Sequence, residues 1–133
     1  MNRELLNDRL CARGLDDRLG GYIILEAAKK AKERGCTCGI YAATTVGEEL
    51  TKHGAARNVH IKYQWENGCG RTCTDADAIH MAGRGITVMS IPLHYMHNPA
   101  EVCSMEDVQG CIDVLAEFLC GIGSDICLKP LEG

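Results

Sequence analysis

Two apolar, β-branched runs alternate with amphipathic helical patterns along this chain of 133 residues, and this alternation is what most constrains its fold. The runs, Cys36 to Thr45 and Ile86 to Leu93, have the composition of buried strands. Apolar residues recur at helical spacing from Leu19 to Arg34, and a second helical pattern follows Ser104. The alternation predicts an α/β fold: a three-layer α/β/α sandwich with a mixed, mostly parallel sheet.

Capping and stop signals mark the ends of these elements. Gly35 stops the first helix, and Ser104 is a suitable N-cap for the last one. The last helix carries one apolar stripe, formed by Val108, Ile112, Leu115, Phe118 and Leu119. We also expect a short strand over Leu10 to Gly14, an edge strand over Ile61 to Trp65, and a helix capped by Thr74.

Length and charge limit the function classes. The chain suits a single domain spanning residues 1–133, and its formal charge of −4 with a pI near 5.7 argues against nucleic-acid partners. It has no apolar run of the roughly 20 residues that a membrane helix needs, and Met1 to Glu4 does not begin a signal peptide. We therefore expect a soluble cytoplasmic protein without a membrane partner, whose nine cysteines are reduced thiols.

Four carboxylates and one histidine stand near the ends of the predicted elements. Asp16 and Asp17 precede the first helix, Glu48 and Glu49 follow the first strand, and His97 follows the second. Side chains at the carboxyl ends of strands can converge at one sheet edge, where carboxylate oxygen and imidazole nitrogen suit zinc. A spare glutamate beside a ligand glutamate can activate a metal-bound water. The simpler alternatives are an ion-paired turn, a solvated loop and a turn histidine.

Four segments of the chain carry a family resemblance, in the family's order. Residues 15–20 read Leu-Asp-Asp-Arg-Leu-Gly, residues 45–55 contain the Glu48-Glu49 pair before Gly-Ala, residues 74–76 read Thr-Asp-Ala, and residues 91–99 contain Tyr-Met-His-Asn-Pro. They resemble motifs of the metallo-aminopeptidases of the glutamyl aminopeptidase, or cellulase M, type. Each motif alone is weakly specific, but together they extend the similarity from about Leu6 to Gly121.

The resemblance implies a metal-dependent exopeptidase that removes residues from the amino end of short peptides. Carried over by motif, Asp16 would bridge two metals, and Glu49 and His97 would complete the ligands of one of them. Glu48 would be the general base, and Asp17, after an unusual cis peptide bond, would steady Asp16. The implied cofactor is a divalent cation, zinc or cobalt.

The chain departs from the family pattern because it is much shorter. A metal histidine and a metal-binding aspartate of the family fall in segments without a counterpart here, so one metal site is retained and the second lacks both terminal ligands. An internal deletion is apparent near residues 56–61, where the chain runs into a segment similar to a much later part of the family. His94 stands where the family has an arginine.

Two functions remain open on the sequence alone. Retention of Asp16, Glu48, Glu49 and His97 favours an aminopeptidase-like hydrolase acting on short peptides. Loss of two of the family's ligands favours a catalytically silent remnant that acts as a binding or assembly module. Sheet edges and apolar faces exposed by the deletion predict a homo-oligomer.

Overall fold

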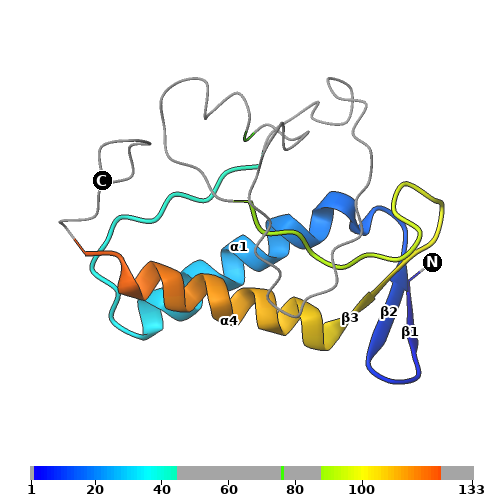
Figure 1. Cartoon of the computed structure of the whole chain (residues 1–133), viewed down its shortest axis with the longest axis horizontal. Coiled ribbons are helices and arrows are strands. Elements are labelled where there is room, and N and C mark those ends of the chain that lie inside the picture. Colours follow the sequence, from blue (N-terminus) through cyan, green and yellow to red (C-terminus); the bar gives the residue numbers. More distant parts are fainter. Residues whose placement is uncertain (1, 45–75, 77–87, 124–133) are drawn as a thin grey trace.

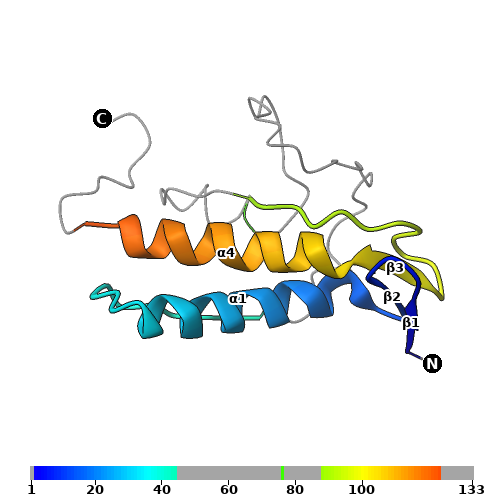
Figure 2. The same ribbon diagram turned by 90° about the horizontal axis from the view of Figure 1, so that it is seen from below.

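The structure is a computed structural model that describes residues 2–44, 76 and 88–123, and within them it contains two long helices and a small antiparallel sheet (Figure 1). The elements are β1 (Arg3–Leu5), β2 (Arg9–Ala12), α1 (Leu15–Glu33), β3 (Glu101–Ser104) and α4 (Met105–Gly121). Both helices begin near the sheet and run side by side in the same direction, away from it (Figures 1 and 2). The amino-terminal ends of the helices therefore meet beside the strands.

The sheet has the order β1-β2-β3, and its register brings distant parts of the chain together. Asn7 and Asp8, in the turn between β1 and β2, both have positive φ, which these residue types tolerate better than most. β2 pairs with β3 so that Ala12 lies opposite Glu101. This pairing sets the start of β3 against the chain just before α1.

Helix α1 follows a glycine and buries one residue in every four. Gly14 precedes it with a φ of 64°, in the left-handed region where glycine is favoured. Asp16 and Asp17 have non-helical dihedral angles, so regular helix follows the Asp-Asp pair. The buried face consists of Leu15, Leu19, Ile23, Ala27 and Ala31. The predicted helix over Leu19 to Arg34 is confirmed in outline.

Helix α4 has the predicted cap and most of the predicted stripe. The Ser104 hydroxyl accepts a hydrogen bond from the Asp107 amide at 3.5 Å. The residues that α4 buries are Val108, Cys111, Ile112 and Ala116. Phe118, expected on the stripe, is 48% exposed. Small residues at the contact, Ala27, Ala31 and Ala116, are fully buried and let the two helices pack closely.

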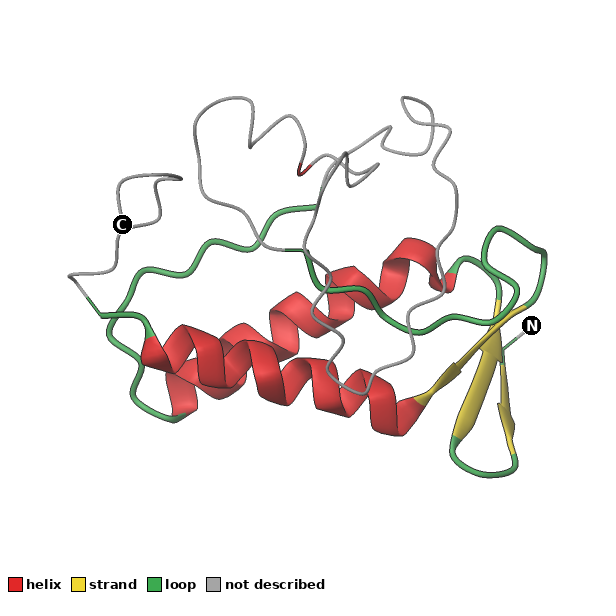
Figure 3. Cartoon of the chain, viewed as in Figure 1, coloured by secondary structure: helices red, strands yellow, loops and turns green. Residues whose placement is uncertain are grey.

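Two strand predictions are wrong for the residues that the structure describes. No strand is found over residues 36–44 or 88–93, which run as irregular chain (Figure 3). A β-branched run forms a strand only where it finds a ladder partner, and β1 and β3 occupy both sides of β2. Near Leu93 only an isolated bridge forms, between His94 and Val102.

The α/β character is therefore confirmed, while a three-layer sandwich with a mostly parallel sheet is not found among the described residues, whose strands are all antiparallel. The strand predicted over Leu10 to Gly14 corresponds to β2. The elements expected at Ile61 to Trp65 and after Thr74, and the deletion near 56–61, lie outside the described residues apart from Ala76. In the described part of the chain, no helix combines the length and the apolar character needed to cross a membrane.

Candidate functional site

Two of the predicted site residues meet at the start of α1. Nε2 of His97 lies 2.9 Å from Oδ2 of Asp16, although 81 residues separate them in the chain. Asp16 is partly buried, with 22% of its side chain exposed, while the His97 side chain is 51% exposed. The pair is an ion pair when the imidazole is protonated and a hydrogen bond otherwise. The pair therefore lies at the surface, with the imidazole more exposed than the carboxylate.

Asp17 is built into the first turn of α1 beside this pair. The peptide bond between Asp16 and Asp17 is cis. The Gly20 amide donates a hydrogen bond to Oδ1 of Asp17 at 2.9 Å. This contact holds the Asp17 carboxylate against the first turn of the helix, so the side chain does not rotate freely.

Glu101 links the two segments that carry Asp16 and His97, and the sequence reasoning missed it. Its side chain is 2% exposed. Oε2 accepts hydrogen bonds from the amides of Leu15 at 2.5 Å and Asp16 at 3.3 Å, while Oε1 accepts one from the His97 amide at 2.9 Å. The only local signal is a carboxylate placed directly before the apolar pair Val102 and Cys103, which is too common to single it out.

The donor atoms of the pair suit a divalent cation. A carboxylate oxygen and an imidazole nitrogen are ligands that zinc and cobalt accept. Among residues 2–44, 76 and 88–123, however, no group of three or more His, Cys, Asp or Glu side chains is arranged to hold a metal ion. The predicted third ligand, Glu49, and the predicted base, Glu48, lie outside the described residues. The described pair can therefore supply two ligands of a larger set.

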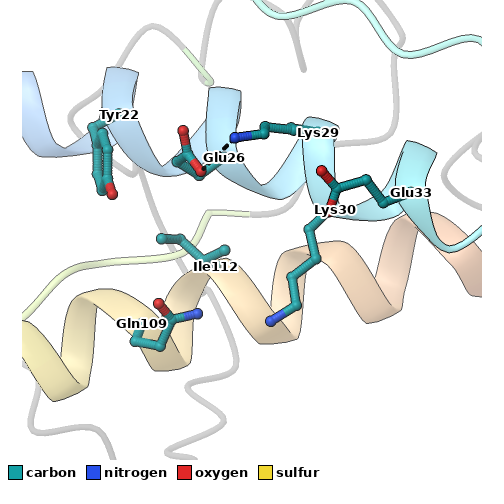
Figure 4. A pocket seen from close by; sticks show the side chains of 7 residues that line it. All are labelled: Tyr22, Glu26, Lys29, Lys30, Glu33, Gln109 and Ile112. Atoms are coloured by element: carbon teal, nitrogen blue, oxygen red, sulfur yellow. Dashed lines mark ion pairs between the residues drawn. The ribbon is translucent and has the colours of Figure 1, made fainter.

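Two surface hollows lie elsewhere. A groove of about 280 Å³ lies between α1 and α4. Figure 4 shows the side chains that line it. Its lining residues are Tyr22, Glu26, Lys29, Lys30, Glu33, Gln109 and Ile112. A second hollow, of about 230 Å³, is lined by Leu5, Arg9, His94, Tyr95 and Val102 at the sheet. Neither is lined by Asp16, Asp17 or His97, so the candidate pair is a feature of the surface near the sheet rather than of these hollows.

A pair of thiols lies at the other end of the helices. Sγ of Cys36 is 3.0 Å from Sγ of Cys38, and the two thiols lie 3.2 and 3.5 Å from the Leu119 carbonyl oxygen. The hydrogen bond with Cys36 raises the pKa of the Cys38 thiol above its ordinary value. Both cysteines are half-buried and lie in irregular chain, not in the strand predicted from Cys36.

Comparisons with known proteins agree with the motifs. The model of the M42 glutamyl aminopeptidase family matches the chain in two stretches, residues 2–59 and 52–114. A protein from Acetivibrio thermocellus named "Putative aminopeptidase" is 33% identical over 97 residues, which are 70% of this chain and 27% of that relative. No solved structure matches the chain.

The two stretches that match the family model include Asp16 and His97, the residues that meet at the candidate site. The chain belongs to the M42 glutamyl aminopeptidase family, because the two matched stretches cover far more than half of it. It spans about a quarter of the length of the curated relative that it matches.

Proposed function

We propose that this chain is a metal-dependent aminopeptidase that removes residues from the amino end of short peptides. The observation that carries the proposal is the 2.9 Å approach of His97 Nε2 to Asp16 Oδ2. Both residues stand in motifs of a peptidase family to which the chain belongs. The two residues are 81 positions apart in the chain, so the fold, and not the local sequence, brings them together.

The proposed ligands are Asp16, Glu49 and His97, and the cation is zinc or cobalt. A divalent cation there would supply Lewis acidity, which polarises a peptide carbonyl and lowers the pKa of water. Glu48 would take the proton of the attacking water and pass it to the leaving amine. Asp17, held by the Gly20 amide, would fix the position of Asp16.

We further propose that one metal site, rather than the two of the longer family pattern, is retained in a single domain with an internal deletion near residues 56–61. Two separate family matches that overlap at residues 52–59 support this arrangement, because an uninterrupted relative would match in one stretch. The consequence is a metal content of one per chain, not two.

The test is metal content by elemental analysis after loading the purified chain with zinc or cobalt, with His97→Ala and Glu49→Ala in parallel. We expect about one metal per chain in the wild type and loss of most of it in both variants. His94→Ala is the matched control, because His94 lies three residues from His97 and makes its described bridge to Val102 through backbone atoms.

Activity is then measured on short peptides with the loaded wild type and with Glu48→Gln. The proposal expects metal-dependent release of amino-terminal residues and a loss of about 100-fold or more in Glu48→Gln with metal content unchanged. Absence of bound metal above background in the wild type overturns it and favours a silent binding module. Two metals per chain would contradict the single site and indicate a ligand donated by a second copy of the chain, which sedimentation would detect.

A further inference from the structure

We propose that Glu101 is the positioning residue of the candidate site: its buried carboxylate bonds to the backbone on both sides and holds the side chains of Asp16 and His97 together. The inference concerns the same site as the proposed function and rests on it for its catalytic meaning. It stands on a separate observation, the three hydrogen bonds that Glu101 accepts from Leu15, Asp16 and His97.

The register of the sheet determines where Glu101 lies. Pairing of β2 with β3 places Glu101 opposite Ala12, three residues before the start of α1. From there Oε2 reaches the Leu15 and Asp16 amides, while Oε1 reaches the His97 amide. One rigid carboxylate therefore spans the two chain segments whose side chains must converge.

Each segment needs an acceptor at that point. Gly14, the residue before α1, makes no side-chain cap, so the first amides of the helix depend on an acceptor from elsewhere. A carboxylate can accept hydrogen bonds from neighbouring amides at once, here from those of Leu15 and Asp16. His97 has a φ of 64°, a region that a histidine rarely adopts, and its amide is held by Glu101. The bonds thus fix the backbone directly behind both proposed ligands.

The arrangement requires a carboxylate of this length. An amide in its place has a single acceptor oxygen, so Glu101→Gln would turn an NH₂ group toward either the α1 amides or the His97 amide. Aspartate keeps both acceptors but is shorter by one methylene, so Glu101→Asp would reach one segment and not both. Glu106→Gln is the matched control, because Glu106 is exposed and lies in the first turn of α4.

The first readout needs no metal and is made on the isotope-labelled full chain by NMR. In the wild type we expect hydrogen-bond couplings from the amides of Leu15 and His97 to the side-chain carboxyl carbon of Glu101. We also expect nuclear Overhauser contacts between the His97 ring and the Asp16 β protons. Both sets should persist in Glu106→Gln, and the ring contacts should be lost in Glu101→Gln.

The second readout is cobalt binding. Titration measures the affinity, and the visible absorption spectrum of the bound ion reports its coordination. Loss of a residue that orients metal ligands without binding the metal typically lowers metal affinity by about 10- to 100-fold. We expect a loss of this size in Glu101→Gln, together with an altered cobalt spectrum. Glu101→Asp should fall between Glu101→Gln and the wild type. A residue with a purely structural role would lower the melting temperature without changing the cobalt spectrum of the folded fraction.

The outcomes separate this inference from the proposed function. If the wild type binds no cobalt, and the Asp16–His97 contacts are present in the wild type but lost in Glu101→Gln, the metal proposal is overturned and the positioning role is sustained. A folded Glu101→Gln with wild-type ring contacts, cobalt affinity and spectrum would overturn the positioning role alone. If neither Glu101 variant folds, the couplings in the wild type decide, and their absence at either amide overturns the inference.

Discussion

At the scale of single residues, the Asp17 carboxylate occupies the space where a side chain at position 20 would begin. A Cβ added to Gly20 would lie 2.1 Å from Oδ1 of Asp17, whereas one added to Gly21 would meet only Thr44 Cγ2 at 3.6 Å. Gly20→Ala must displace the carboxylate and break its bond to the Gly20 amide. We expect a loss of about 1–2 kcal/mol in the free energy of unfolding, measured in urea.

Gly21→Ala is the control for this prediction. Replacing a glycine inside a helix with alanine usually stabilises by up to about 1 kcal/mol, and the contact with Thr44 is of ordinary length. The two neighbouring substitutions should therefore have opposite signs. Equal stabilisation by both would show that Asp17 does not hold the position seen at the start of α1.

The sequence could single out the two residues that meet at the candidate site, but not the contacts of Glu101 with the backbone beside them. Asp16 and His97 stand in recognisable motifs, and the structure brings them together at 2.9 Å. Glu101 has no motif of its own, because its function depends on burial and on amides 85 and 86 residues away. Contacts of this kind arise from the sheet register, which local patterns do not encode. Glu48 and Glu49 stay predictions.

At the scale of elements, ion pairs join α1 to α4 along one side of their contact. Lys30 pairs with Asp113, and Arg34 Nη1 lies 2.9 Å from Glu117 Oε2. The hydrogen bond from Lys30, followed by that from Gln109, lowers the pKa of Asp113 from its ordinary value of 3.8. A carboxyl whose folded pKa is lowered stabilises the protein above the unfolded value, and this contribution is lost as pH falls through the folded value.

The prediction is that Asp113→Asn lowers the urea midpoint near pH 7 by a small amount, and that the difference from the wild type shrinks as pH falls below about 3.8 and disappears below the lowered folded value. Lys30→Gln and the double variant complete a cycle that isolates the pair. Because both side chains are partly exposed, 0.5 M salt should reduce the coupling. A difference that stays constant from pH 7 to pH 3 would contradict the assignment.

The helices could be predicted well from the sequence and the strands poorly, for a physical reason. A helix satisfies its backbone hydrogen bonds within itself, so the spacing of apolar residues and the Ser104 cap suffice to place α1 and α4. A strand needs a partner elsewhere in the chain. The run from Cys36 is more apolar than β3, yet β3 forms the ladder because it reaches the free edge of β2.

At the scale of the whole molecule, thiols form part of the core that joins the sheet to the helices. Cys103, on β3, is 1% exposed, and Cys111, on α4, is 2% exposed. Both pack in one cluster with Ile23, Leu93 and Val108. A core of this composition stays intact only while the thiols are protonated, since an ionised thiolate is costly in apolar surroundings.

Burial of these thiols therefore makes the fold less stable at alkaline pH. Loss of solvation raises the pKa of Cys103 and of Cys111 above the ordinary value of 9.0. A group whose folded pKa is raised leaves stability intact below the unfolded value, and stability falls as pH rises from about 9 toward the folded value. We expect the free energy of unfolding, measured in urea with a reductant present, to decline above pH 9.

The decline should be shallower in Cys103→Ala and Cys111→Ala, even though both are less stable at pH 7 through lost packing. Cys120→Ala is the control, because Cys120 is exposed and should leave the slope unchanged. A slope above pH 9 that is the same in all three variants and the wild type would place the alkaline sensitivity elsewhere than in the thiols of the core.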